Sequence, residues 1–220
     1  MQAWGGPSTV ACRWTTRRDG DLAVSGDPEV LAARRAAVAP GPWTWLRQVH
    51  GARVVTVAAP GEHAGAEADA VVTGIAGAPI AVHTADCVPV LLTSEAGVAV
   101  VHAGWRGLAA GVIEAAAAAL EALGAPVASA TCGPHIRARC YEFGAADLDA
   151  VAEACGAVVR GTTAWGTPAL DLTAGVQGAC DRLGVELRDT GHCTACSPVH
   201  FSHRARGESG RQALVAWLEP

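Results

Sequence analysis

The chain has 220 residues, of which 50% are hydrophobic and 17% are charged, a composition that indicates a compact globular protein and excludes a disordered one. The formal net charge of −5, without a basic patch, argues against nucleic acids and anionic membranes as partners. All 16 basic residues are arginine, which excludes Schiff-base chemistry, a lysine base and a P-loop lysine. The length favours one domain over residues 1–220.

The N-terminal sequence MQAWGGPSTVACRW lacks the basic region and apolar run of a secretory signal peptide. No apolar stretch reaches the roughly 18 residues that a membrane-spanning helix requires. We therefore expect a cytoplasmic protein without a membrane partner. In a reducing cytoplasm the eight cysteines would be metal ligands, catalytic groups or buried thiols rather than disulfides.

The first half of the chain reads mainly as short strands. The first thirty or so residues are expected to form edge strands and turns, and Asp27 is expected to cap a short helix over 30–38. The strands that follow are predicted at 43–49, 52–57, 69–73, 80–83, 88–92 and 98–104. Residues 94–97 read as the turn between the last two of these strands.

The second half of the chain alternates helices with strands. Residues 104–107 read as a turn, followed by one long helix over 108–123 that Gly124 ends. Strands are predicted at 127–132, 185–189 and 212–218, helices at 145–154 and from about 172 to 183, and a polar loop at 191–211. Interleaved helices and strands indicate a mixed α/β sandwich.

The stretch HTADCVPVLLTSEAGVAVVHAGWRG, from His83 to Gly107, contains the most informative pattern. Cys87 and His102 lie at the edges of two apolar runs that read as neighbouring buried strands. Neighbouring strands can bring the two side chains into contact. A thiolate beside an imidazole either binds a soft divalent metal or forms a nucleophile–base pair, and both interpretations stay open.

His50, in RQVHG, also follows an apolar strand and precedes a turn. With Cys87 and His102 it would make three protein ligands with one open position, which is the pattern of a catalytic zinc site. The alternative for each residue alone is a histidine or thiol packed in the core.

Further polar residues surround this trio in the sequence. His83 is either a fourth ligand or a supporting residue, and Asp86 and Asp69 are candidates to accept the second ring N–H of a ligand histidine, although Asp69 also reads as a turn residue. Arg106, beside a helix start, suits a phosphate or carboxylate, unless it only caps its own loop. The residues expected to face the pocket or its ligand are Arg47, Gln48 and Trp105.

Cys193 and Cys196 form a second notable pair, with C-x-x-C spacing. Together with Cys132 and Cys140 they would make a structural zinc site. However, CGPHIRARC has seven residues between its cysteines, which matches usual ligand spacing poorly. Buried or near-surface thiols are the alternative interpretation.

Several motifs resemble one known family. These are QVHG, ADAVVT, TADCVPVLL, VVHAGWRG, CGPHI…CYEFG and FSHR…GRQALVAWL. They are similar to the laccase-domain family, which bears a multicopper polyphenol oxidoreductase name and is also called peptidoglycan editing factor and purine nucleoside phosphorylase. The resemblance runs from about His50 to the C-terminus. His203 stands where the family commonly has the tyrosine of FSYR.

The resemblance implies a four-layer α/β/β/α fold with mixed sheets. It also implies a metal site of His50, Cys87 and His102, usually holding Zn²⁺, with Cu²⁺ as the alternative. The implied activity is phosphorolysis of adenosine, inosine, guanosine or methylthioadenosine to the base and (methylthio)ribose 1-phosphate, together with adenosine deamination. The implied partners are purine nucleosides and orthophosphate. The high apolar content permits a monomer or a homodimer.

Three other functions remain open at this point. A copper-dependent, laccase-like polyphenol oxidase needs many clustered histidines, whereas the chain has eight histidines, no His-x-His pair and a single methionine. A cysteine hydrolase in peptidoglycan editing would use Cys87 as nucleophile and His102 as base. A non-enzymatic protein would bind a metal or nucleoside without turnover. The usual deaminase signature, HxE with PCxxC, is absent from the sequence.

Overall fold

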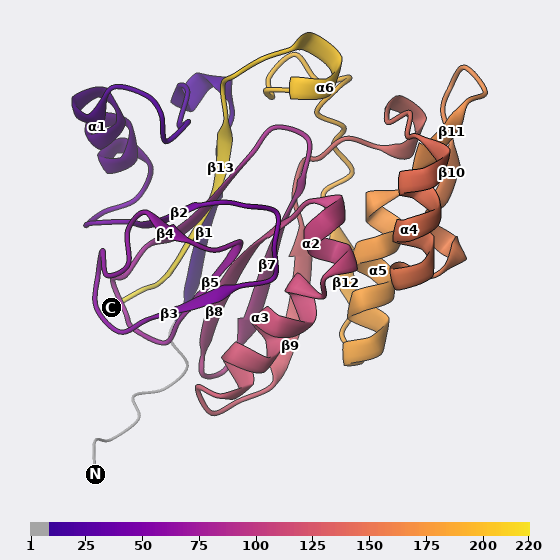
Figure 1. Ribbon diagram of the computed structural model, residues 1–220. Coiled ribbons are helices and arrows are strands. Elements are labelled where there is room, and N and C mark those ends of the chain that lie inside the picture. Colours follow the sequence, from indigo (N-terminus) through magenta and orange to yellow (C-terminus); the bar gives the residue numbers. More distant parts are fainter. Residues whose placement is uncertain (1–8) are drawn as a thin grey trace.

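The computed structural model describes residues 9–220, so the part of the N-terminal prediction that falls on residues 1–8 lies outside the described residues. Two β-sheets pack face to face, and helices cover both outer faces (Figure 1). This arrangement confirms the mixed α/β sandwich with its order α/β/β/α. Within residues 9–220 no helix has both the length and the apolar character needed to cross a bilayer.

The larger sheet has six strands in the order β12-β9-β7-β8-β5-β3. Its strands are β3 (Val54–Val57), β5 (Ala70–Thr73), β7 (Val88–Ser94), β8 (Gly97–Ala103), β9 (Val127–Cys132) and β12 (Leu187–Asp189). The antiparallel β7–β8 hairpin lies at its centre, and the outer pairs β3–β5 and β12–β9 are parallel. The sheet is therefore mixed, as the resemblance to the family implied.

The smaller sheet has five strands in the order β1-β13-β6-β2-β4. Its strands are β1 (Val10–Trp14), β2 (Thr44–Arg47), β4 (Ala66–Glu67), β6 (Ile80–Thr84) and β13 (Gln212–Leu218). The last strand of the chain, β13, pairs antiparallel with both β1 and β6. The two ends of the described chain thus lie together in one sheet (Figure 1).

The helices separate onto the two sides of the sheets (Figure 1). They are α1 (Pro28–Val38), α2 (Trp105–Ala109), α3 (Val112–Glu121), α4 (Ala145–Cys155), α5 (Leu172–Leu183) and α6 (His203–Arg206). Helix α1 packs on the smaller sheet, and α2, α3, α4 and α5 cover the larger one. A hairpin of β10 (Arg160–Thr162) and β11 (Pro168–Leu170), which the sequence did not predict, lies beside α4.

Alternating side chains explain why the layers form. On β8, Val98 and Val100 point between the two sheets, whereas Ala99 and Val101 pack against the helices. Every one of these side chains is fully buried. A strand that is apolar on both faces needs a cover on each side, so the continuous apolar runs of the sequence dictate inner strands of a layered sandwich.

The predicted turn at 104–107 and the single helix at 108–123 are wrong. Gly104 is the N-cap of α2, and the Leu108 N–H donates to its carbonyl at 2.9 Å, so residues 105–107 are helical. Gly111 then adopts the left-handed conformation, with φ of +78°, and separates α2 from α3. Glycine takes this conformation without the penalty that a Cβ brings, which lets the chain change direction here.

Several predicted element ends are confirmed. Asp27 caps α1 by accepting hydrogen bonds from Glu29 N and Val30 N, both at 3.0 Å. Gly184 ends α5 in the left-handed conformation. These local signals work because each satisfies backbone groups that the helix end leaves without a partner.

Candidate metal centre and its pocket

The β7–β8 hairpin brings Cys87 and His102 together. Its register pairs Val88 with Ala103 and Pro89 with His102. Cys87 immediately precedes β7 and therefore lies beside the end of β8. The prediction that neighbouring strands would join these two side chains is confirmed by this pairing.

His50 reaches the same point from the end of β2 in the smaller sheet, with its backbone in the left-handed region at φ +60°. Its Nε2 lies 3.9 Å from Cys87 Sγ, and the ligand atoms of His50, Cys87 and His102 all lie within 4.8 Å of one another. A Cβ on Gly104 would lie 2.8 Å from His50 Cδ2 and 3.1 Å from Cys87 Sγ. Because glycine has no Cβ, the side chains of His50 and Cys87 can approach each other beside Gly104.

Asp69 holds two of the three residues in position. It lies opposite His102 at the β5–β8 junction, and its Oδ1 accepts a hydrogen bond from His102 Nδ1 at 2.8 Å. The same carboxylate accepts from the backbone N–H groups of His50 at 2.8 Å and Gly51 at 2.7 Å. Asp69 thereby stabilises the strained backbone of His50 and leaves His102 Nε2 to face the site.

The electrostatics of the trio favour an ionised thiol. Burial would raise the pKa of Cys87, but the charge and hydrogen bonds of His102 and His50 outweigh it and lower that pKa to about 6. Burial would lower the pKa of His102, but Cys87 and Asp69 raise it to about 9. Burial also opposes ionisation of Asp69, yet the hydrogen bonds from His102 and Gly51 lower its pKa. Without a metal the pair is a thiolate beside an imidazolium.

Two imidazole nitrogens and one thiolate suit a zinc-class ion, and three ligands leave one coordination position open. His50 is exposed, Cys87 is partly exposed and His102 is buried, so the trio is accessible from one side. The same geometry also provides a Cys87–His102–Asp69 arrangement for nucleophilic catalysis. The chemistry of the donor set thus fits both interpretations made from the sequence.

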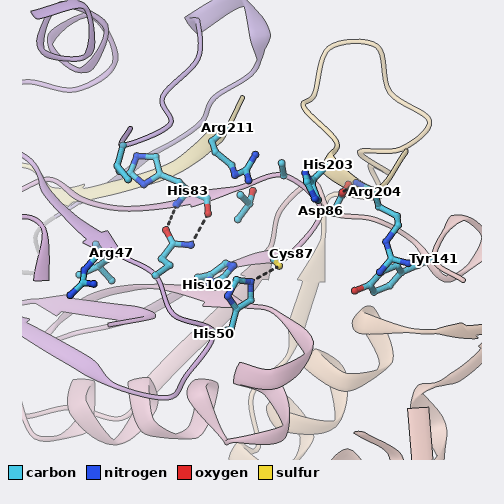
Figure 2. Close-up of a pocket in the computed structure, with 15 residues that line it drawn as sticks. Arg47, His50, His83, Asp86, Cys87, His102, Tyr141, His203, Arg204 and Arg211 are labelled. Atoms are coloured by element: carbon cyan, nitrogen blue, oxygen red, sulfur yellow. Dashed lines mark hydrogen bonds between the residues drawn. The ribbon is translucent and has the colours of Figure 1, made fainter. Parts of the chain in front are cut away.

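The trio lies on the wall of a pocket of about 470 Å³ (Figure 2). That volume falls within the roughly 300–1,000 Å³ of small-molecule sites. Residues from both sheets and from the C-terminal segment line it. They are Val24, Leu46, Arg47, Gln48, His50, His83, Thr84, Ala85, Asp86, Cys87, His102, Tyr141, His203, Arg204 and Arg211.

The predicted pocket residues Arg47, Gln48 and His83 all line this cavity. The Gln48 amide donates to the His83 carbonyl and accepts from the His83 N–H, both at 2.7 Å, so it joins the end of β2 to β6. Arg47 is exposed and pairs with Glu67 at 2.7 Å. Among residues 9–220 neither ring nitrogen of His83 has a hydrogen-bond partner, and burial lowers its pKa to about 3.

Asp86 does not orient a ligand histidine, which corrects the sequence prediction. Its Oδ1 accepts from Thr194 Oγ1 at 2.6 Å and Ser202 Oγ at 2.7 Å, and its Oδ2 accepts from Arg204 N at 2.7 Å. Its backbone has a positive φ of 101°. The Asp86 carboxylate therefore anchors Thr194, Ser202 and Arg204 beside Cys87. Of the two predicted aspartates, Asp69 is the one that binds the ring of His102.

Arg106 and Trp105 do not line this pocket, contrary to the prediction. Because residues 105–107 are helical, the Arg106 side chain is exposed, and its guanidinium carbon lies 4.0 Å from the centre of the Trp105 ring. Trp105 in turn packs edge-on against Phe143, with ring centroids 5.5 Å apart. Trp105 therefore packs toward Phe143, just before α4, and Arg106 stacks on the Trp105 ring.

Tyr141, Arg204 and Arg211 line the pocket but were not among the candidates from the sequence. The Arg204 guanidinium carbon lies 4.8 Å from the centre of the Tyr141 ring. Arg211 Nη1 donates to the carbonyls of Glu208, Ser209 and Gly210, and Figure 2 shows its guanidinium directed toward the cavity. All three belong to motifs that carried the resemblance, CYEFG and FSHR…GRQ, which was the available signal.

Comparisons with known proteins agree with this architecture. Residues 14–219 match the family described as multi-copper polyphenol oxidoreductase laccase. A Streptomyces coelicolor protein named purine nucleoside phosphorylase is 43% identical, over 98% of this chain and 93% of its own length. The solved structure of a Neisseria meningitidis protein of family-model DUF152 has a TM-score of 0.85 and 31% identity, covering 99% of this chain and 98% of its own. YlmD from Geobacillus stearothermophilus has a TM-score of 0.84 and 25% identity, covering 100% of this chain and 98% of its own. The chain therefore belongs to the multi-copper polyphenol oxidoreductase laccase family.

Proposed function

We propose that this chain is a zinc-dependent purine nucleoside phosphorylase that cleaves adenosine, inosine, guanosine or methylthioadenosine. The observation that carries the proposal is one pocket of about 470 Å³ that joins the donors His50, Cys87 and His102 to the guanidinium groups of Arg204 and Arg211. A metal-ligand set beside anion-binding groups suits a phosphate and a nucleoside together. The name of the Streptomyces relative supports the same reaction.

In phosphorolysis a phosphate oxygen bonds to C1′ of the ribose while the C1′–N9 bond breaks and its electron pair leaves with the purine. We assign phosphate binding to Arg204 and Arg211, because planar guanidinium groups match phosphate oxygens. These two replace Arg106, which lies away from the pocket. Arg47 is a weaker candidate because phosphate would compete there with Glu67.

His50, Cys87 and His102 would hold the ion, and a bound Zn²⁺ would supply a Lewis acid to the pocket. Burial raises the pKa of Tyr141 to about 12, so its hydroxyl keeps the proton and can donate to the departing purine. Deamination of adenosine is the second activity we propose. In that reaction a water oxygen bonds to C6 of the adenine ring and the C6 amino group leaves as ammonia, and a Zn²⁺ held by the trio would supply the Lewis acid that activates the water.

The test is a product analysis with metal-analysed protein. Adenosine, inosine, guanosine and methylthioadenosine are each incubated with and without phosphate. We expect adenine and ribose 1-phosphate from adenosine only when phosphate is present, and inosine as the product of deamination. Removing the metal or replacing Cys87→Ala should abolish both reactions, while Cys12→Ala, which changes a thiol on β1, should leave them unchanged.

Two further variants test the phosphate assignment. Arg204→Ala and Arg211→Ala should raise KM for phosphate more than KM for the nucleoside. The absence of turnover of all four nucleosides by folded, zinc-loaded protein would contradict the proposed function. An unchanged KM for phosphate in both variants would contradict only the assignment of the two arginines.

A cysteine hydrolase is the second candidate, because the Cys87 pKa of about 6 and the His102–Asp69 contact are what a nucleophile–base pair requires. This candidate predicts hydrolysis of an activated ester by protein from which all metal has been removed. The hydrolysis should be lost in Cys87→Ala. Activity that disappears on metal removal and returns with Zn²⁺ would eliminate it.

A further inference from the structure

A second group of sulfur atoms lies outside the site described above. Cys140 ends a 3₁₀ turn over Ala138–Cys140, and Cys193 and Cys196 belong to a turn that precedes α6. Their three Sγ atoms lie within 4.8 Å of one another, and Cys140 Sγ lies 3.4 Å from Cys196 Sγ. We call Cys140, Cys193 and Cys196 the trithiol cluster.

We propose that the trithiol cluster is a second metal site, which holds a zinc-class ion through three thiolates. Cys193 and Cys196 supply the C-x-x-C pair that is common in zinc sites, and Cys140 supplies the third sulfur from a segment more than fifty residues earlier. Cys132, the fourth cysteine considered from the sequence, is fully buried on β9 and does not join the cluster.

The number and spacing of the sulfur atoms favour a metal over a disulfide. A disulfide joins two sulfurs at about 2.05 Å and leaves the third thiol without a role. Tetrahedral zinc, with Zn–S bonds of about 2.3 Å, separates its sulfur ligands by about 3.8 Å. The 3.4 Å between Cys140 and Cys196 is much closer to the second value. Simple core packing is also a poor explanation because Cys196 is exposed.

The surrounding charge is suited to such an ion. Three thiolates and one divalent cation carry a net charge of −1, which one guanidinium can balance. Arg139 Nη2 donates to Cys196 Sγ at 3.1 Å, whereas neighbouring Arg137 is engaged with Asp189 at 2.5 Å. Exposure of Cys196 leaves the fourth coordination position to solvent, and thiolate ligands select zinc or Cu(I) rather than magnesium or calcium.

The cluster lies next to residues that form the pocket wall. Tyr141, which follows Cys140, lines the pocket, and Thr194, between the other two cysteines, donates to Asp86. An ion in the trithiol cluster would tie these two segments together and hold the wall beside Cys87. We therefore assign it a structural role, separate from the catalytic role proposed for the first site.

The experiment is a metal titration of the full chain, reduced and freed of metal, with Zn²⁺ or Co²⁺ alone. We expect two equivalents to bind. Cys196→Ser and Cys87→Ala should each retain one, the double variant none, and Cys12→Ser both. Cobalt bound to Cys87→Ala should give stronger thiolate-to-metal absorption than cobalt bound to Cys196→Ser, because three thiolates remain there instead of one. One equivalent in the unaltered chain, unchanged by Cys196→Ser, would overturn the proposal.

A second measurement does not depend on how the variants fold. Unaltered protein is treated with an alkylating reagent with and without Zn²⁺, and each cysteine is followed by mass spectrometry. Bound metal should slow alkylation of the trithiol cluster by about tenfold or more, because the thiolate is the reactive form. Equal rates in both samples, or a Cys140–Cys196 disulfide that persists under reducing conditions, would overturn the proposal. Loss of nucleoside turnover alone has no bearing on it.

Discussion

At the scale of single residues, Asp69 has the largest influence on the candidate metal centre. It is fully buried, and its two carboxylate oxygens accept hydrogen bonds from the His102 ring and from the backbone of His50 and Gly51. One side chain therefore sets both the ring orientation of His102 and the strained backbone of His50.

The substitution Asp69→Asn should weaken zinc binding at the first site by about 10- to 100-fold. The amide NH₂ group cannot accept a hydrogen bond, so either His102 or the backbone of Gly51 loses its partner. The measurement is a competition titration against a chromophoric chelator. Glu67→Gln, which changes a nearby exposed carboxylate, is the control and should bind zinc normally. Normal binding by folded Asp69→Asn protein would contradict the role of Asp69.

Zinc affinity at the first site should rise about tenfold per pH unit between about pH 6 and pH 9. In this window Cys87 is already ionised, whereas His102 must lose one proton before it can bind the ion. The sign follows from the raised pKa of His102, since protons compete with zinc below it and cease to compete above it. Measuring affinity against pH in Cys196→Ser protein removes the contribution of the trithiol cluster. A flat profile would mean that His102 is neutral throughout.

At the scale of elements, the break between α2 and α3 redirects the chain just after His102. The sequence pattern from 108 to 123 is helical throughout, and the left-handed backbone at Gly111 interrupts it. As a consequence α2 contacts α4 and α5, while α3 packs along β8 and β5. A glycine in a helical pattern is compatible with either outcome, so local propensity could not decide between one helix and two.

Replacing Gly111→Ala should lower the free energy of unfolding by about 1–2 kcal/mol, because the added Cβ is unfavourable in the left-handed conformation. The same change at Gly178, inside α5, should instead raise it by about 0.5–1 kcal/mol. Urea denaturation of the metal-free proteins measures both. Equal effects of the two substitutions would show that the Gly111 conformation is unimportant for stability.

At the scale of the whole molecule, the two sheets hold the two halves of the candidate metal centre. His50 follows a strand of the smaller sheet, whereas Cys87 precedes β7 and His102 lies on β8 of the larger one. The apolar layer between the sheets keeps these halves together. Its side chains include Leu46, Ile80, Val82, Leu91, Val100 and Leu214.

The substitution Leu214→Ala should cost about 2–5 kcal/mol of stability, because it opens a cavity in this layer where the side chain is fully buried. The melting temperature of the metal-free protein should fall accordingly. Val199→Ala, at a position with 36% exposure, is the control and should change stability by less than about 0.5 kcal/mol. A comparable loss in both variants would argue against a tightly packed layer between the sheets.

The sequence alone determined the elements whose signals are local. Asp27 and Gly184 mark helix ends because they satisfy neighbouring backbone groups, and the apolar runs around Val90 and Val100 mark strands that are buried on both faces. The pairing of Cys87 with His102 was also predictable, since a short turn leaves two adjacent strands almost no alternative to forming a hairpin. His50 was also a candidate from its own sequence context, and the resemblance to the family implied the same three residues and the order of the layers.

Only the tertiary structure decided which distant residues share a site. Arg204 and Arg211 reach the pocket because β13 pairs with β6, and Arg106 is excluded from it because α2 begins three residues earlier than predicted. Cys132 does not belong to the trithiol cluster, because β9 directs its thiol into the core. Spacing along a chain does not encode these contacts, because they depend on how separate strands pair and pack, and that is determined by burial across the whole molecule.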